Sequence, residues 1–79
     1  MTNEISLNKL REGKVAEIIS VIGGRMVTKR LVDLGLIPGT KIKVLRKAPL
    51  WGPVEIEARG SRLVLGRGLA SKILVHPVK

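Results

Sequence analysis

The sequence predicts a small, mainly β fold: one domain over residues 1–79, in which about five short strands and one short helix close into a barrel. Two observations lead to this prediction. The chain is 44% hydrophobic but has one Trp and neither Phe nor Tyr, so its core must be built from Val, Ile and Leu, which pack well on pleated sheets. Short apolar stretches, several of them alternating with polar residues, are separated by Gly and Pro, a pattern typical of successive hairpins.

The first two elements lie on either side of a glycine pair. A strand is expected from Val15 to Ile22, because this stretch is rich in β-branched residues and Gly23-Gly24 interrupt it. The helix is expected over residues 25–34, where apolar residues recur at i, i+4 and i+7 from Val27 and charged residues occupy the other faces.

The segment LGLIPG should end this helix after Leu34. Gly35 suits the left-handed C′ position, and Leu36 can fold back onto the last turn. Pro38 prevents the helix from continuing, and with Gly39 it predicts a tight turn into the next strand.

Two strands that alternate cleanly follow, TKIKV at residues 40–44 and VEIEAR at residues 54–59. Their apolar residues share one face and their charged residues share the other. An antiparallel register that pairs position 44 with position 56 would place Lys43 opposite Glu57, and opposite charges in such a pair help to fix the register.

The last third of the chain predicts a hairpin and a closing strand. Gly60-Ser61 fits a two-residue turn of the II′ kind, after which RLVLG makes a short strand. Residues 67–72 are expected to form a single helical turn, and ILVHPV a final strand. One flat sheet of this length could not bury the apolar faces of five short strands in this order. We therefore expect the strands to close into an SH3-like barrel.

The composition restricts location and partners. The chain carries 15 Lys and Arg against 6 Asp and Glu, a net charge of +9, which favours acidic partners such as nucleic acid, anionic lipid or an acidic protein face. It has no Cys, its first residues are polar, and it has no long apolar run, so we expect neither a signal peptide nor a membrane span, and a cytoplasmic protein that meets a membrane only at its surface.

No catalytic, cofactor or metal site is predicted, and we expect the protein not to be an enzyme. His76 is the only His and there is no Cys, so a nitrogen- or sulfur-based metal site has no set of ligands. Glu55 and Glu57 share a strand face, but Lys41 and Lys43 are their expected neighbours, which indicates surface ion pairs.

The segment KAPLWGPV places the only aromatic residue of the chain, Trp51, on a loop between two prolines. Such a residue either plugs a small core or is displayed as a binding anchor. We expect display, because the prolines stiffen the loop, Leu50 adds an apolar neighbour, and Arg46 and Lys47 supply positive charge at its base. The predicted partner-binding residues are therefore Trp51, Leu50, Arg46 and Lys47.

The order and spacing of these features over nearly the whole chain resemble the FeoA family of ferrous iron transport proteins. The residues that carry the resemblance are Leu7-x-x-Leu10 before Gly13, then Arg30-Leu31-x-x-Leu34-Gly35-Leu36-x-Pro38-Gly39-x-x-Ile42-x-Val44, Pro49-x-x-Gly52-Pro53, Gly60-x-x-Leu63-x-Leu65, and Ala70-x-x-Ile73-x-Val75.

This resemblance implies a free-standing, cytoplasmic SH3-like domain that works with the large membrane ferrous iron transporter (FeoB-like) and docks on its cytoplasmic G-protein part. The protein would then be a non-enzymatic accessory that modulates the transporter, without a cofactor of its own and at the inner membrane face only through its partner. Weak self-association is a further option.

The alternative hypothesis is a nucleic-acid-binding barrel of the KOW type, since PGTKIKVLRKAPLWGPV resembles that pattern and the charge suits phosphate. Against it, stacking platforms normally need several aromatic residues.

Overall fold

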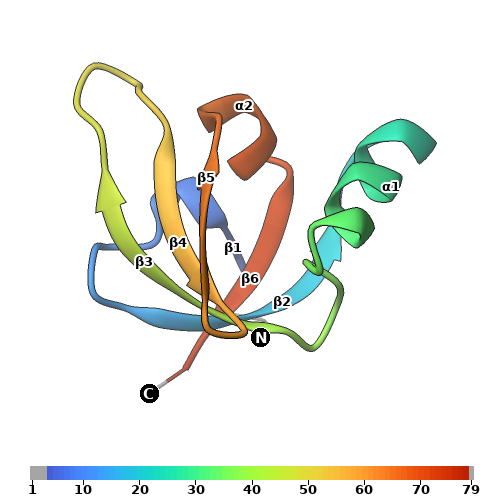
Figure 1. Cartoon of the computed structure of the whole chain (residues 1–79), viewed down its shortest axis with the longest axis horizontal. Helices are drawn as coiled ribbons and strands as arrows, with labels where there is room; N and C mark the ends of the chain where they lie inside the picture. The colour runs from blue at the N-terminus through green and yellow to red at the C-terminus, as the bar shows by residue number, and fades with distance from the viewer. Residues whose placement is uncertain (1–3, 79) are drawn as a thin grey trace.

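The computed structural model describes residues 4–78 and shows a curled, antiparallel sheet with short helical segments in the connections between its strands (Figure 1). Within these residues the sheet has six strands in the order β1-β6-β2-β3-β4-β5. Along the chain the elements are β1 (Ile5–Ser6), η1 (Leu7–Lys9), β2 (Val15–Val21), α1 (Arg25–Asp33), β3 (Lys41–Lys47), β4 (Val54–Ala58), β5 (Ser61–Leu65), α2 (Arg67–Ala70) and β6 (Ile73–Pro77). The mainly β fold with one short helix and one helical turn is confirmed.

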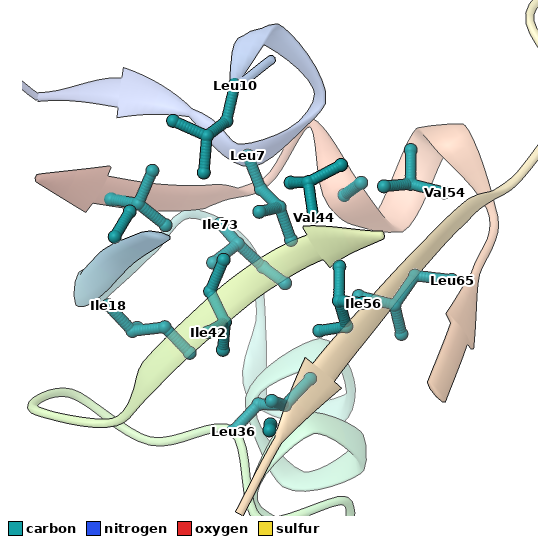
Figure 2. Close-up of a cluster of buried hydrophobic side chains, with 14 of the residues drawn as sticks. Leu7, Leu10, Ile18, Leu36, Ile42, Val44, Val54, Ile56, Leu65 and Ile73 are labelled. Atoms are coloured by element: carbon teal, nitrogen blue, oxygen red, sulfur yellow. The ribbon is translucent and has the colours of Figure 1, made fainter. Parts of the chain in front are cut away.

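The inner face of the sheet encloses one hydrophobic core of aliphatic side chains (Figure 2). Burial of each Leu, Ile or Val contributes about 1.5–3 kcal/mol relative to its exposure. Trp51 does not belong to this core. The core residues are Leu7, Leu10, Ala16, Ile18, Leu31, Leu36, Ile42, Val44, Val54, Ile56, Ala58, Leu65, Ala70, Ile73 and Val75.

The register between β3 and β4 is the predicted one. Val44 lies opposite Ile56, with both side chains in the core, and Lys43 lies opposite Glu57 on the outer face. The two charged groups face one another without a nitrogen–oxygen approach of 4.0 Å or less, so the pairing favours the register by a solvent-screened attraction. The expectation of closed ion pairs on this face was wrong.

The end of α1 is also the predicted one. The helix stops at Asp33, Leu34 is the C-cap, and Gly35 takes a left-handed conformation with φ of 81°. The N–H of Gly35 donates to the carbonyl of Val32 at 2.9 Å, and the N–H of Leu36 donates to that of Leu31 at 2.8 Å. These two bonds are those of a Schellman motif, which turns the chain and delivers Leu36 to the core.

Three details differ from the sequence-based expectation. The pairing of β1 with β6 and the adjoining η1 were missed, and η1 buries Leu7 completely. The hairpin between β4 and β5 turns at Arg59-Gly60 and not at Gly60-Ser61, because Ala58 pairs directly with Ser61. Both turn residues have positive φ, 53° and 79°, as a type I′ turn requires and a II′ turn does not.

β3 is longer than predicted. It was expected to end at Val44 but continues to Lys47, with a bulge between Val44 and Arg46. A bulge lets a strand bend and twist while it keeps its partner. Arg46 and Lys47 therefore lie on a strand, opposite Glu55 and Val54, and not on the loop that follows.

Candidate interaction site at the β3–β4 loop

The loop between β3 and β4 presents two large apolar side chains to solvent at one end of the barrel. Leu50 is 94% exposed and Trp51 is 83% exposed. Both residues adopt left-handed backbone conformations, with φ of 57° and 62°. For residues with a Cβ this conformation costs about 1–2 kcal/mol each, so the remainder of the fold must hold the loop in place.

Hydrogen bonds close the loop at its base. The N–H of Ala48 donates to the carbonyl of Pro53 at 3.0 Å, which continues the β3–β4 ladder by one step. Within the loop, the N–H of Gly52 donates to the carbonyl of Pro49 at 3.1 Å. A Cβ at Gly52 would lie 2.7 Å from the Cβ of Ala48, so only glycine fits at this crossing of the chain.

Arg67, at the start of α2, holds the loop from the other side. Its Nε donates to the carbonyl of Gly52 at 3.1 Å, and one terminal nitrogen donates to the carbonyl of Ala48 at 3.3 Å. The guanidinium carbon lies 5.7 Å from the centroid of the Trp51 ring, within the range of a cation–π interaction. Figure 1 shows α2 and this loop at the same end of the barrel.

Arg67 was missed by the sequence-based reasoning. It was interpreted only as part of a strand-to-helix corner, because nothing local in the sequence connects it to residues 48–52. Only the three-dimensional arrangement brings α2 beside the loop.

The two predicted basic residues have different surroundings. Lys47 is half-buried: its Nζ donates to the carbonyl of Leu10 at 3.2 Å, and its backbone N–H donates to a carboxylate oxygen of Glu12 at 2.7 Å. Lys47 therefore joins β3 to the segment after η1 and has less freedom to meet a partner. Arg46 is exposed on the outer face of β3.

A shallow cleft of about 190 Å³ lies on the outer face beside the loop. Its walls combine apolar and charged side chains from three successive strands and the loop. It is lined by Arg46, Ala48, Pro53, Glu55 and Val64. The exposed apolar surface of the loop thus has a neighbouring hollow with one basic and one acidic residue at its walls.

The described residues hold no cluster suited to metal binding: within residues 4–78 no three or more His, Cys, Asp and Glu side chains come together. His76 is exposed on β6, opposite Glu17 of β2. Likewise, none of the helices in that part of the chain combines the length and apolar character needed to cross a membrane.

Comparison with known proteins gives a consistent result. The model of the FeoA domain family matches residues 5–77. A protein of Methanocaldococcus jannaschii named Fe(2+) transport protein A is 40% identical over 66 residues, which cover 84% of this chain and 78% of that protein.

Solved structures agree with this family assignment. The solution structure of a FeoA protein from Chlorobium tepidum is 43% identical, covers 95% of this chain and 71% of that one, and superposes with a TM-score of 0.86. The crystal structure of an iron uptake regulatory protein (FeoA) is 32% identical, covers 95% and 99% of the two chains, and superposes with a TM-score of 0.89.

Proposed function

The chain belongs to the FeoA family of ferrous iron transport proteins, and on this basis we propose that it is a non-enzymatic accessory protein of ferrous iron uptake that docks on the cytoplasmic G-protein part of the membrane ferrous iron transporter. It works in the cytoplasm and reaches the inner membrane face only through this partner. The iron itself is the cargo of the transporter.

The observation that supports docking is the display of Leu50 and Trp51 on a braced loop. Leaving a large apolar side chain in water forgoes about 1.5–3 kcal/mol of burial. Two such residues side by side, both in left-handed conformations, are therefore costly to the isolated barrel. A partner surface that covers them recovers the burial, and Trp is a frequent anchor of interfaces.

The bracing by Arg67 favours tight docking. A loop that is already ordered loses little conformational entropy on binding. The guanidinium carbon lies 5.7 Å from the centroid of the Trp51 ring and places positive charge next to it, as does Arg46 on the neighbouring strand. The partner surface expected here is an apolar depression with an acidic rim.

Docking modulates the transporter through differential affinity. A protein that binds one conformation of its partner better than another shifts the population toward the first. The barrel needs no catalytic residue for this role.

Binding of the purified cytoplasmic domain of the transporter tests this proposal. Trp51→Ala should abolish binding and lower ferrous iron uptake in cells, while changing the free energy of unfolding by less than about 1 kcal/mol, as expected at an exposed position. The matched control is Met26→Ala, because Met26 is 84% exposed on α1, away from the loop. This control should bind and support uptake like the unmodified protein.

Two outcomes would contradict the proposal. Unchanged binding and uptake in Trp51→Ala would remove the loop from the interface. Equal losses in Trp51→Ala and Met26→Ala would show that general surface hydrophobicity, and not this loop, decides binding. Repeating the measurement at raised salt separates docking from the nonspecific attraction of a protein with a charge of +9.

A further inference from the structure

The outer edge of β5 has no partner strand in the described structure, and it is the last strand of the sheet on that side. Figure 1 shows β5 running from the β4–β5 turn to α2. An open strand edge presents unpaired N–H and C=O groups that can pair with another chain. The other terminal strand of the sheet, β1, has only two residues.

The pairing of β5 with β4 decides which backbone groups face outward. Ala58 and Ser61 flank a two-residue turn and therefore form a hydrogen-bonded pair, and such pairs alternate along an antiparallel ladder. The same alternation follows from the bond between Ala48 and Pro53 on the other side of β4. The N–H and C=O of Arg62 and Val64 consequently point away from β4, toward the open edge.

The side chains beside this edge define what could pair with it. Val64 is 65% exposed on the outer face and forms one wall of the cleft beside the β3–β4 loop. Leu63, between Arg62 and Val64, points inward and is half-buried against the core. Arg62 is exposed on the outer face, where its neighbour across the ladder is Glu57.

The charge of this face is unbalanced. Glu57 lies opposite Lys43 of β3 on one side and Arg62 of β5 on the other, so one carboxylate faces two cations. None of these groups forms an ion pair within 4.0 Å. Two copies of a chain with a charge of +9 would repel one another, whereas an acidic segment would be attracted.

We propose that the edge of β5 binds an extended acidic segment of a partner protein as an additional antiparallel strand. The segment places an apolar residue opposite Val64, an apolar residue opposite Leu63 and an acidic residue opposite Arg62. Backbone bonds to Arg62 and Val64 supply affinity, and the three side-chain positions supply selectivity. This surface adjoins the β3–β4 loop through the cleft at Val64, but its backbone groups belong to β5, and its occupant is defined by chemistry alone.

A short synthetic peptide is the probe. The end-blocked heptapeptide Gly-Ser-Val-Val-Glu-Asp-Gly aligns its first Val with Val64 and its Glu with Arg62. Titration followed by amide NMR should give saturable shifts centred on residues 61–65. Replacing both acidic residues of the peptide by Lys should weaken binding about tenfold, since a like charge replaces an attractive pair.

Backbone methylation of the peptide tests the pairing itself. N-methylation of the Glu removes an N–H that faces β5 and should abolish binding, whereas N-methylation of the second Val, whose N–H faces away, should leave it unchanged. On the protein, Val64→Pro removes an outward N–H without breaking the ladder with β4, and should also abolish binding. The peptide result stands even if this variant does not fold.

Several results would overturn the proposal. They are the absence of saturable shifts, equal binding of the acidic and Lys peptides, equal effects of the two methylations, and shifts centred on the Leu50–Trp51 loop. Sedimentation that shows a dimer of the unliganded protein, dissociated by Val64→Pro, would instead make the occupant a second copy. Because the probe contains no part of the transporter, its failure leaves the docking proposal standing, and the reverse also holds.

Discussion

Replacing Arg67 by Met should loosen the β3–β4 loop while leaving the barrel folded. Met keeps much of the length and apolar stem of Arg but removes the guanidinium. That group donates to the carbonyls of Gly52 and Ala48 and lies 5.7 Å from the centroid of the Trp51 ring. These contacts join α2 to a loop that the sequence separates from it.

The magnitude follows from these three contacts. An intramolecular hydrogen bond contributes about 1 kcal/mol net, and an exposed cation–π contact about 0.5–1 kcal/mol. Since the loop lies at the surface, its freed carbonyls recover hydrogen bonds with water. We therefore expect Arg67→Met to lower the free energy of unfolding by about 1–2 kcal/mol and Tm by roughly 5–10 °C.

Two measurements separate loosening of the loop from a general loss of stability. Trp51 is the only Trp and the chain has no Tyr or Phe, so the fluorescence anisotropy of the protein reports this loop alone, and it should fall in Arg67→Met. The amides of Ala48 and Gly52, which donate within the loop and at its base, should exchange with deuterium faster. Lys72→Met, an exposed change just after α2, is the control and should alter neither.

Unchanged anisotropy and unchanged amide exchange in Arg67→Met would refute the reasoning. A loss of stability without either change would mean that Arg67 stabilises α2 and does not hold the loop in place. Arg67→Lys refines the test: it keeps the charge but not the planar fork of donors, so its fluorescence anisotropy should lie close to that of Arg67→Met and below that of the unmodified protein.

Three further predictions concern the barrel as a whole. Gly35→Ala should lower the free energy of unfolding by roughly 1 kcal/mol: a Cβ at Gly35 would meet no atom within 4 Å, but its φ of 81° is unfavourable for Ala. Gly68→Ala, in α2 and equally unobstructed, should raise the free energy of unfolding by about 0.5–1 kcal/mol. Equal effects of the two substitutions in urea unfolding would mean that the Schellman motif contributes nothing to stability. The isolated protein should show no tight site for ferrous iron or zinc in calorimetric titration, and a submicromolar stoichiometric site that His76→Ala removes would disprove this. Moderate salt should raise Tm, because it screens repulsion in a chain of charge +9; a fall in Tm would point to ion pairs that hold the fold together.

The predictable parts of the fold are those with local causes. The end of α1 depends on Gly35, Leu36 and Pro38, which act within one turn of the chain. The register of β3 with β4 depends on alternation within each strand, since a shift by one residue would expose Val44 and Ile56. Both features were therefore visible in the sequence.

The missed parts depend on contacts between distant segments or on residues in uncommon conformations. β1 has two residues and no periodicity, and it exists only because β6 offers a free edge. The hairpin was placed one residue late because Arg59 takes a positive φ, a position at which Asn or Asp is the usual signal. The exposure of Trp51 could be expected from its prolines, but the contact with Arg67 could not.

The pairing of β1 with β6 also bears on how the barrel assembles in time. Ile5 pairs with Val75, so this ladder joins segments from opposite ends of the described chain, whereas β3, β4 and β5 form a meander of neighbours. Closing so long a loop is slow compared with forming adjacent hairpins. During synthesis the meander can fold early, while Leu7 and Leu10 stay uncovered until β6 has left the ribosome. The barrel is thus completed by its last strand, and a stalled chain lacking β6 would be an aggregation-prone substrate for chaperones.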